Sequence, residues 1–480
     1  MVLVKYADLC HFTCVDNLVS VSRRRFLTLA GVSAAGVTMV SPLEAFYARV
    51  ANGQAANGIG YGPLSPRLPE NADELQGVVL GGFDLGTTPL LELPPGFNYT
   101  AISITGQPMT DGGRVPSNHD GMAAFPGSNN TTILVRNHEV GAATSANPVV
   151  TASKYDPLAG GGTTTLVIGP NRRVRSQYAS LGGTIRNCAG GPTPWGSWVT
   201  CEEDVSIASK RHGYNFEVPA SATTRVADPV PLVAMGRFNH EAVAVEPETG
   251  WVYQTEDRGD SCFYRFTPNQ KGNLQSGGVL EALKITDSRA ANVEPVTGSA
   301  NTSTGYLGLK NVPLSVTWVK IDDVDPVGDT VRAEARSKGA ARFSRGEGAW
   351  YGNGLTYFVC SNGGNARTGQ VFAYKSNPND PTTGTLTLVV EATATDLVAA
   401  PDNICVAPFG DLFLCEDGSG TEYVVGVSTK GELYRFATNK LNGSEFAGAC
   451  FSPDGKTMFV NIQDPGITLA IWGPWSRKRA

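Results

Sequence analysis

The sequence predicts an all-β fold, a six-bladed β-propeller with irregular insertions, and three observations lead to this prediction. The 480 residues include 56 glycines and 30 prolines, and only 17% are charged, a balance that favours many short strands joined by tight turns. Six segments repeat one pattern, in which a turn is followed by a short apolar strand and then by a polar end. Their spacing is irregular but always leaves room for a four-stranded sheet.

The six repeated strands all end in acidic or amide side chains. They are TILVRNHE (132–139), SWVTCEED (197–204), WVYQTED (251–257), LTYFVCSN (355–362), DLFLCED (411–417) and TMFVNIQD (457–464). Another apolar strand, which opens with polar residues, precedes each of them; in the clearest case Asn239-His240-Glu241 leads into AVAVE. The turn of an antiparallel hairpin reverses the chain, so the start of its first strand and the end of its second lie together. All these polar ends are therefore expected at one face.

Six such hairpins have no stable fold in isolation, but a radial arrangement closes them into a propeller with a central channel and only short edges. Later strands with alternating apolar residues, such as 262–266, 370–375 and 432–437, would supply the outer strands of the blades. The alternative is an array of β-sandwiches in which the acidic residues only cap strands.

The predicted convergence of polar ends would bring many carboxylates into one funnel. They are Glu139, Glu202, Glu203, Asp204, Glu241, Glu256, Asp257, Glu347, Asp402, Glu416, Asp417 and Asp464. Like charges at close range raise one another's pKa or require cations. The sequence therefore predicts a metal cluster at one mouth of the channel, and the hard, oxygen-binding Ca²⁺ is the expected ion.

The N-terminus has the pattern of a twin-arginine signal peptide. Ser22-Arg23-Arg24-Arg25-Phe26-Leu27 leads into an apolar run that ends at Val40, and small residues follow between Ala45 and Ala56. We therefore predict an N-terminal extension and signal peptide over residues 1–56, a single propeller domain over 57–480, and a periplasmic or extracellular location. The twin-arginine translocase would be a partner during export.

The composition argues against several partners. A net charge of −6 and an isoelectric point near 5.5 give no basic surface for nucleic acid. The apolar run of the leader is too short to span a membrane, so we expect no stable membrane anchor, and we expect a monomer. Seven cysteines remain after the leader, and an odd number leaves at least one thiol unpaired.

The most distinctive stretch of the sequence runs from Gly182 to Asp204. Cys188 stands close to glycines, and the diacid Glu202-Glu203 follows after a tight turn, so a thiolate and carboxylates could meet at the channel mouth. On chemistry alone, a buried and inert Cys188 is the commoner interpretation.

This stretch and five other features resemble the PhoX-type alkaline phosphatases. The shared features are the leader, the Asn-His-Glu motifs, CAGGxTPWG (188–196) followed by CEE, FSRGEG (343–348), PDN (401–403) and CEDG (415–418). The resemblance implies a six-bladed propeller with a mixed Fe³⁺ and Ca²⁺ cluster that hydrolyses small-molecule phosphate esters and releases inorganic phosphate.

The resemblance also implies roles for particular residues. It makes Cys188 an iron ligand, Glu202 or Glu203 and Glu241 metal-bridging carboxylates, and Glu347 a further ligand. Arg345 would hold the phosphate, because a guanidinium group donates a fork of hydrogen bonds to two oxygens. The full set of candidate metal ligands is Cys188, Glu139, Glu202, Glu203, Glu241, Glu256, Asp257, Glu347, Asp402 and Glu416.

Two polar residues at strand ends are further candidates for catalysis. Asn137 is a plausible hydrogen-bond donor to phosphate. His240 has the chemistry to bind a metal, orient phosphate or donate a proton, although a histidine at a strand end is commonly structural.

Two other functions fit parts of the pattern. A calcium-dependent propeller lactonase or related hydrolase needs carboxylates and asparagine around Ca²⁺ but has no use for Cys188 or Arg345. A non-catalytic, calcium-binding exported propeller would keep the acidic ring and tolerate the loss of both residues. The connections between blades look short, which leaves the choice among monoesters, diesters and nucleotides open.

Overall fold

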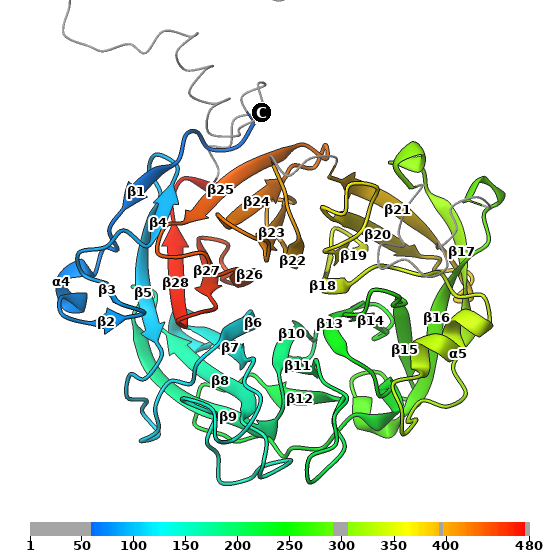
Figure 1. Ribbon diagram of the computed structural model, residues 1–480, viewed down its shortest axis with the longest axis horizontal. Coiled ribbons are helices and arrows are strands. Elements are labelled where there is room, and N and C mark those ends of the chain that lie inside the picture. The colour runs from blue at the N-terminus through cyan, green and yellow to red at the C-terminus, as the bar shows by residue number, and fades with distance from the viewer. Residues whose placement is uncertain (1–58, 291–305, 393–396, 476–480) are drawn as a thin grey trace, which may run out of the picture. The chain divides into compact units, whose positions relative to one another are not determined.

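The computed structural model describes residues 59–290, 306–392 and 397–475. The predicted leader lies outside these residues, and so does the proposed boundary at residue 56. The described residues all belong to one compact unit, in which strands dominate and sheets radiate around a centre (Figure 1). The prediction of an all-β, propeller-like fold is confirmed.

Six hairpins supply the innermost strands of the sheets. The innermost strands are β6 (His119–Pro126), β10 (Asn187–Pro192), β13 (His240–Val245), β18 (Gly346–Gly352), β22 (Pro401–Val406) and β26 (Phe446–Phe451). Their antiparallel partners are β7 (Thr132–His138), β11 (Ser197–Glu202), β14 (Val252–Glu256), β19 (Leu355–Cys360), β23 (Leu412–Glu416) and β27 (Thr457–Ile462). Each innermost strand contacts the next, and β26 contacts β6, which closes the ring (Figure 1).

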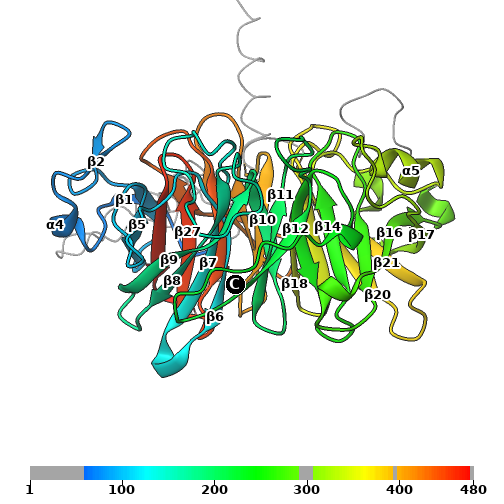
Figure 2. The same cartoon turned by 90° about the horizontal axis from the view of Figure 1, so that it is seen from below.

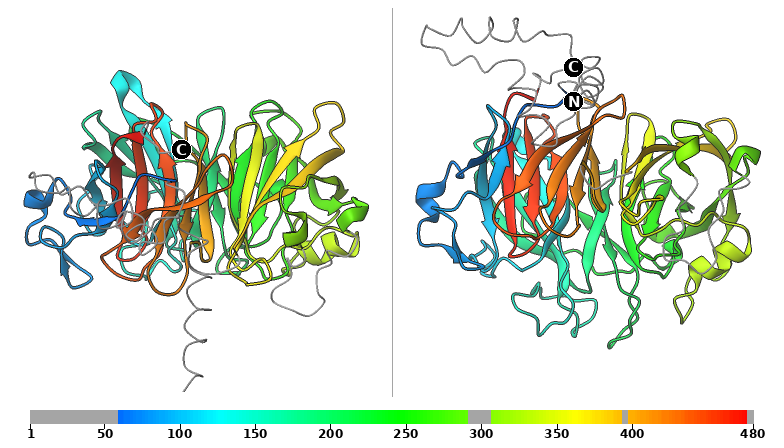
Figure 3. Two further views of the ribbon diagram at one scale, coloured as in Figure 1. Left: turned by 90° about the horizontal axis from the view of Figure 1, so that it is seen from above. Right: turned by 45° about the horizontal axis from the view of Figure 1, so that its top comes forward.

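The outer strands complete the sheets, which Figure 2 and the left view of Figure 3 show from the side. They are β1 (Ser65–Arg67), β4 (Leu91–Leu93), β5 (Asn98–Ile104), β8 (Gly161–Ile168), β9 (Val174–Thr184), β12 (Asn215–Pro219), β15 (Tyr264–Pro268), β16 (Gly278–Ile285), β17 (Leu314–Lys320), β20 (Gln370–Ser376), β21 (Thr383–Glu391), β24 (Tyr423–Val427), β25 (Leu433–Asn439) and β28 (Ile467–Trp472). Strand β5 pairs with β28, so a strand early in the described chain completes the last sheet.

The described strands do not form the six separate sheets that the sequence predicts. Strand β17 pairs with both β16 and β21, and it thereby joins the groups β13–β16 and β18–β21 into one nine-stranded sheet. The other sheets have the orders β6-β7-β8-β9, β10-β11-β12, β26-β27-β28-β5 and β1-β4-β25-β24-β23-β22, beside the small hairpin of β2 (Val79–Leu80) and β3 (Phe83–Asp84).

The helical segments of the part of the chain that the structure describes are short and lie between strands. They are α4 (Ala72–Leu75), α5 (Val331–Ser337) and the 3-10 turns η1 (Ser128–Asn130), η2 (Val233–Met235), η3 (Leu274–Ser276), η4 (Ser288–Ala290) and η5 (Tyr306–Leu309). Helix α5 belongs to the insertion between β17 and β18, which agrees with the predicted irregular insertions. No helix among the described residues has the length and apolarity needed to cross a membrane.

The hydrophobic core lies between neighbouring sheets. Trp198 of β11 packs with Phe125 and Ile133 of the β6–β7 hairpin, and the rings of Phe263 and Phe358 stack with centroids 4.1 Å apart. Burial of each such side chain contributes about 1.5–3 kcal/mol, so these layers hold the inner strands in fixed positions.

Each of the six inner strands carries one extra residue near its start, a β-bulge relative to its partner. The bulged pairs are Asp120-Gly121, Cys188-Ala189, Glu241-Ala242, Glu347-Gly348, Asp402-Asn403 and Gly448-Ala449. A bulge interrupts the alternation of a strand and redirects a side chain. In five of the six bulges, the first residue is aspartate, glutamate or cysteine.

Glycine follows the acid in two of these bulges because adjacent inner strands approach closely there. A Cβ atom on Gly121 would lie 2.5 Å from the Cα atom of Ala189, and one on Gly348 would lie 2.6 Å from the carbonyl oxygen of Asp402. Both distances are too short for any side chain. The small residues thus let neighbouring bulges pack together and bring their acidic side chains close.

Candidate metal centre

Each hairpin presents residues to the centre from three positions. The first precedes the bulged strand by one residue, the second opens the bulge, and the third follows the partner strand. The third-position residues are Glu139, Glu203, Asp257, Ser361, Asp417 and Gln463, and their backbone N–H groups donate to the carbonyls of Asn118, Arg186, Asn239, Arg345, Ala400 and Glu445 at 3.0–3.3 Å. This shared hydrogen bond fixes the same local geometry in all six hairpins.

The described residues contain two groups of potential metal ligands at this end of the hairpins. The thiol of Cys188 and carboxylate oxygens of Glu203 and Glu241 lie within 4.8 Å of one another, and so do carboxylate oxygens of Glu241, Glu347 and Asp402. We call these the thiol triad and the carboxylate triad. Glu241 belongs to both, so the two triads adjoin.

Burial and mutual repulsion shape the electrostatics of the triads. Burial raises the pKa of Glu241 well above its usual range, and the carboxylates of Asp402 and Glu347 raise it further. Burial first, and then Asp417, raises the pKa of Asp402 to about 7. Burial first, and then Glu241, raises the pKa of the Cys188 thiol. Cations in the triads would reverse this preference and favour the thiolate and carboxylates, because metal binding displaces protons.

The donor sets of the two triads suit different cations. A thiolate is a ligand for iron and other transition metals and has little affinity for Ca²⁺, whereas three carboxylates suit a hard cation. Among the described residues, the Cys188 Sγ atom makes only weak hydrogen bonds, to the carbonyl oxygens of His240 at 3.5 Å and Glu241 at 3.6 Å. The residues present therefore fit a mixed metal centre.

More acidic side chains lie beside the triads than the sequence analysis assigned. Burial raises the pKa of Glu445, and Asp402, Asp120 and Asp417 raise it further. The Gln463 side-chain amide donates to Asp120 and Glu139 at 3.0 Å each. Asp120 and Glu445 escaped prediction, although Asn118-His119-Asp120 aligns with Asn239-His240-Glu241 and could have revealed Asp120.

Two arginines occupy the first position of their hairpins and form ion pairs with carboxylates of the centre. Arg345 donates from Nε and Nη2 to both carboxylate oxygens of Asp257 at 2.8 Å, and its Nη2 lies 3.0 Å from Glu347. The Nη2 atom of Arg186 lies 2.7 Å from Glu139 and 2.6 Å from Glu203. Arg345 thus lies beside Glu347, and its role in holding phosphate stays a prediction, whereas Arg186 was not predicted.

Three predicted ligands lie outside the centre: Glu202, Glu256 and Glu416. Each is the last residue of its strand, and successive side chains of a strand face opposite sides, so the next residue faces the centre instead. Glu256 accepts hydrogen bonds from Tyr264 at 2.7 Å and Arg332 at 3.1 Å.

The other two glutamates, Glu202 and Glu416, form hydrogen bonds with neighbouring loops. Glu202 accepts hydrogen bonds from the His212 ring at 2.7 Å and from the backbone N–H of Gly213 at 2.9 Å. Glu416 accepts hydrogen bonds from the backbone N–H groups of Ala399 at 2.7 Å and Tyr423 at 3.0 Å. The structure therefore does not support metal binding by Glu202, Glu256 or Glu416.

The structure does not support the predicted role of Asn137 as a phosphate donor. Its amide nitrogen donates to the carbonyl oxygens of Cys188 at 3.1 Å and Ala189 at 2.6 Å. Its amide oxygen accepts from Trp198 and Thr200, each at 2.8 Å. With both ends of the amide engaged in the core, Asn137 supports the bulge that carries Cys188.

The predicted catalytic role of His240 is also not supported. Its Nε2 atom lies 2.9 Å from the carbonyl oxygen of Gly236, and its ring stacks on Phe238 with centroids 3.6 Å apart. Burial lowers the pKa of His240 to about 3, so the ring stays neutral. Because it is next to Glu241 on one strand, it faces the core while Glu241 faces the centre.

All seven cysteines of the described residues are buried and free. The prediction of at least one unpaired thiol is confirmed. Of these seven, only Cys188 belongs to a group of potential metal ligands.

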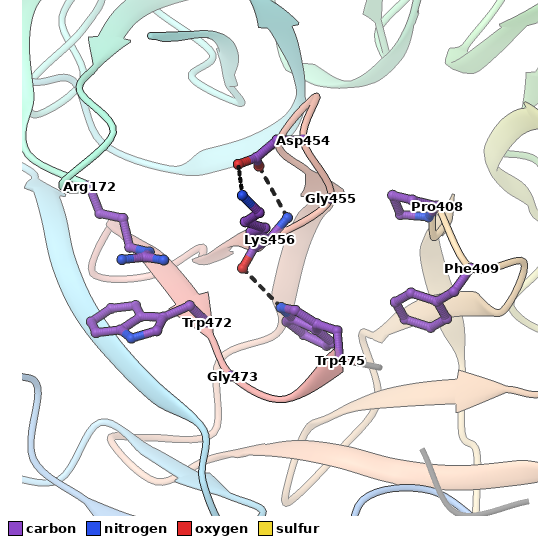
Figure 4. A pocket seen from close by; sticks show the side chains of 9 residues that line it. All are labelled: Arg172, Pro408, Phe409, Asp454, Gly455, Lys456, Trp472, Gly473 and Trp475. Atoms are coloured by element: carbon purple, nitrogen blue, oxygen red, sulfur yellow. Dashed lines mark hydrogen bonds and ion pairs between the residues drawn. The ribbon is translucent and has the colours of Figure 1, made fainter. Parts of the chain in front are cut away.

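A pocket of about 460 Å³ lies at the other end of the hairpins (Figure 4). Phe409 comes from the β22–β23 turn, Asp454 and Lys456 from the β26–β27 turn, and Arg172 from the β8–β9 turn. The triads lie where these hairpins begin and end, so the pocket is not part of the metal centre.

Comparisons with known proteins point to one family. The profile of the family described as alkaline phosphatase PhoX matches residues 80–466. Pseudomonas fluorescens PhoX, solved in complex with the transition-state analogue vanadate, superposes with a TM-score of 0.62 and 19% identity, over 80% of this chain and 96% of that chain. A search of curated proteins gives no significant match.

Two other solved structures share less of the fold. A gluconolactonase from Xanthomonas campestris has a TM-score of 0.39 and 13% identity, over 86% of this chain and 99% of that chain. Virginiamycin B lyase from Staphylococcus aureus has a TM-score of 0.37 and 13% identity, over 78% and 99%.

A propeller-like fold that gathers a thiol and many carboxylates where its inner strands begin defines a metal-binding β-propeller. The chain belongs to the alkaline phosphatase PhoX family, because the family profile matches more than half of it. The protein is therefore a metal-dependent phosphoric ester hydrolase, which confirms the resemblance found in the sequence.

Proposed function

We propose that the protein is an exported phosphatase that releases inorganic phosphate from small-molecule esters by means of iron and calcium. The observation that carries this proposal is the juxtaposition of a thiol triad and a carboxylate triad that share Glu241. A phosphate ester is an anion that repels its nucleophile, so a centre for its hydrolysis needs several adjacent positive charges.

The donor sets support a division of the metals between the triads. Cys188, Glu203 and Glu241 would hold Fe³⁺, and Glu241, Glu347 and Asp402 would hold Ca²⁺. Asp120, Glu139, Asp257, Asp417 and Glu445 would hold further calcium or balance its charge. When bound, the cations neutralise the ester and act as Lewis acids on its oxygens.

The protein side chains orient the substrate. The Arg345 side chain is 40% exposed. Its Nε and Nη2 atoms donate to the two carboxylate oxygens of Asp257, and the same pair of donors can bind two oxygens of a phosphate group. Asp257 and Glu347 hold the guanidinium group in place before substrate arrives, and Asn137 holds the bulge of Cys188. This preorganisation lowers the entropy lost when the ester binds.

The fold is best counted as six blades. Six inner strands in a closed ring, six bulges at the same point and one shared hydrogen bond per hairpin support this count. On this view, β17 bridges two blades, and β1 and β4 extend a third.

Export rests on the twin-arginine pattern at Arg23 and Arg24, which lies outside the described residues. Replacing both arginines by lysine is expected to leave the protein in the cytoplasm, while deletion of residues 1–20 should leave export intact. Fractionation of cells that express the variants tests this, and normal secretion of the double-lysine variant would exclude the twin-arginine route.

We also propose that the exported protein is a monomer.

A substrate panel tests the proposed activity. Protein supplied with iron and calcium should release phosphate from p-nitrophenyl phosphate, and orthovanadate should inhibit it. A calcium-dependent lactonase would instead open lactones, and a non-catalytic propeller would do neither. Hydrolysis of lactones without any phosphate release would replace the phosphatase proposal.

A further inference from the structure

Arg186 and Arg345 occupy equivalent places in two hairpins. Each lies one residue before its bulged strand, each has a left-handed backbone with φ of 46° and 51°, and the carbonyl of each accepts the N–H of its third-position residue, Glu203 or Ser361. The side chains are similarly exposed, at 44% and 40%. An unpredicted arginine therefore repeats the position of the predicted phosphate-binding residue.

Each arginine serves one triad. Arg186 pairs with Glu203 of the thiol triad, and Arg345 pairs with Glu347 of the carboxylate triad. No carboxylate is shared between the two arginines. The two guanidinium groups therefore lie beside different members of the adjoining triads.

Arg186 also has hydrogen-bond donors that no described residue accepts from. Its recorded contacts with the described residues all use Nη2, which leaves Nη1 and Nε without a described partner. Arg258, which follows the third-position residue Asp257, differs, because its Nε, Nη1 and Nη2 atoms donate to Asp329, Asp257 and Asn239 respectively. Arg186 can thus donate hydrogen bonds from Nε and Nη1 to an anion, whereas all three nitrogens of Arg258 already donate to protein groups.

We propose that Arg186 contacts the phosphoryl group together with Arg345 and thereby favours monoesters over diesters. This inference rests on the proposed phosphatase activity. The second pKa of a phosphate monoester is near 6, so at alkaline pH it carries two negative charges, whereas a diester carries one. Two guanidinium groups match the dianion, and charge-assisted hydrogen bonds are about twice as strong as neutral ones. The diester also replaces one free oxygen with a second ester group.

The test compares p-nitrophenyl phosphate with bis(p-nitrophenyl) phosphate at pH 9. We expect Arg186→Ala to lower kcat/KM for the monoester about 100-fold, the scale of one lost transition-state donor, and to lower it for the diester at least about tenfold less. Arg345→Ala should lower both, and Arg186→Lys, which keeps the charge but not the fork, should lie between the wild type and Arg186→Ala. Arg173→Ala is the matched control. Arg173 lies in the β8–β9 turn, away from the triads, and forms an exposed ion pair with Glu74 of α4.

Binding and metal content separate a substrate contact from a structural role. Arg186→Ala should weaken orthovanadate binding, measured by calorimetry, while its iron and calcium contents and melting temperature stay at wild-type values. Equal losses on both substrates, lost metal, or unchanged kinetics in Arg186→Ala would each overturn the inference, and Arg186→Lys decides the matter if Arg186→Ala does not fold. Failure of the wild type to hydrolyse either ester would instead refute the proposed function.

Discussion

Replacement of Cys188 by serine is expected to abolish p-nitrophenyl phosphate hydrolysis and to remove the bound iron. A hydroxyl group has nearly the size of the thiol but is not a soft anionic ligand. Loss of residues that merely support a metal ligand costs about 10–100-fold in activity, so loss of a ligand should lower kcat/KM by more than about 100-fold. The fold should persist, because the hydrogen bonds of Sγ within the described part of the chain are the two weak ones to His240 and Glu241.

Elemental analysis and steady-state kinetics on the same preparation test this prediction. Cys201→Ala is a suitable control, because Cys201 is also buried and free but belongs to neither triad. It should lower the melting temperature and leave iron in place. Full activity and undiminished iron in Cys188→Ser would make Cys188 an ordinary core residue.

Removal of all metal is expected to abolish activity and to destabilise the fold, most strongly at alkaline pH. Burial raises the pKa of Glu203 to about 8 and that of Asp402 to about 7, from values of 4.5 and 3.8. The folded protein without metal therefore binds these protons more tightly than the unfolded chain. Their stabilising contribution is complete below about pH 4 and is lost as the pH rises through 7 to 8.

Calorimetry of chelated protein at pH 5, 7 and 9 measures this effect. The melting temperature should fall as the pH rises, and added Ca²⁺ should restore it most at pH 9, because a ligand that binds only the folded state stabilises it. If the melting temperature changes with neither pH nor Ca²⁺ after proven metal removal, the acidic strand ends do not bind cations.

The repeated hairpins could be found in the sequence because their pattern is local. Alternating apolar residues, tight turns and polar strand ends are enough to place Glu203, Glu241 and Glu347 at one face. The pairing of β17 with β21 could not be foreseen, because it joins segments far apart in the chain.

The choice between neighbouring acids depended on details that the sequence does not display. Glu202 and Glu203 are adjacent, and only the position where β11 ends decides that Glu203 faces the centre. The same holds for His240, which faces the core beside Glu241. Asp120 and Arg186 were missed, although Asp120 occupies the same bulge position as Glu241 and Arg186 the same first position as Arg345, so both follow from alignment of the bulges.

The metal content of wild-type protein, purified after native export, tests the central claim most directly. We predict that elemental analysis finds iron together with calcium, and that the iron is absent from Cys188→Ser prepared in the same way. Calcium without iron in the active wild-type protein would contradict the mixed metal centre at Cys188 and Glu241.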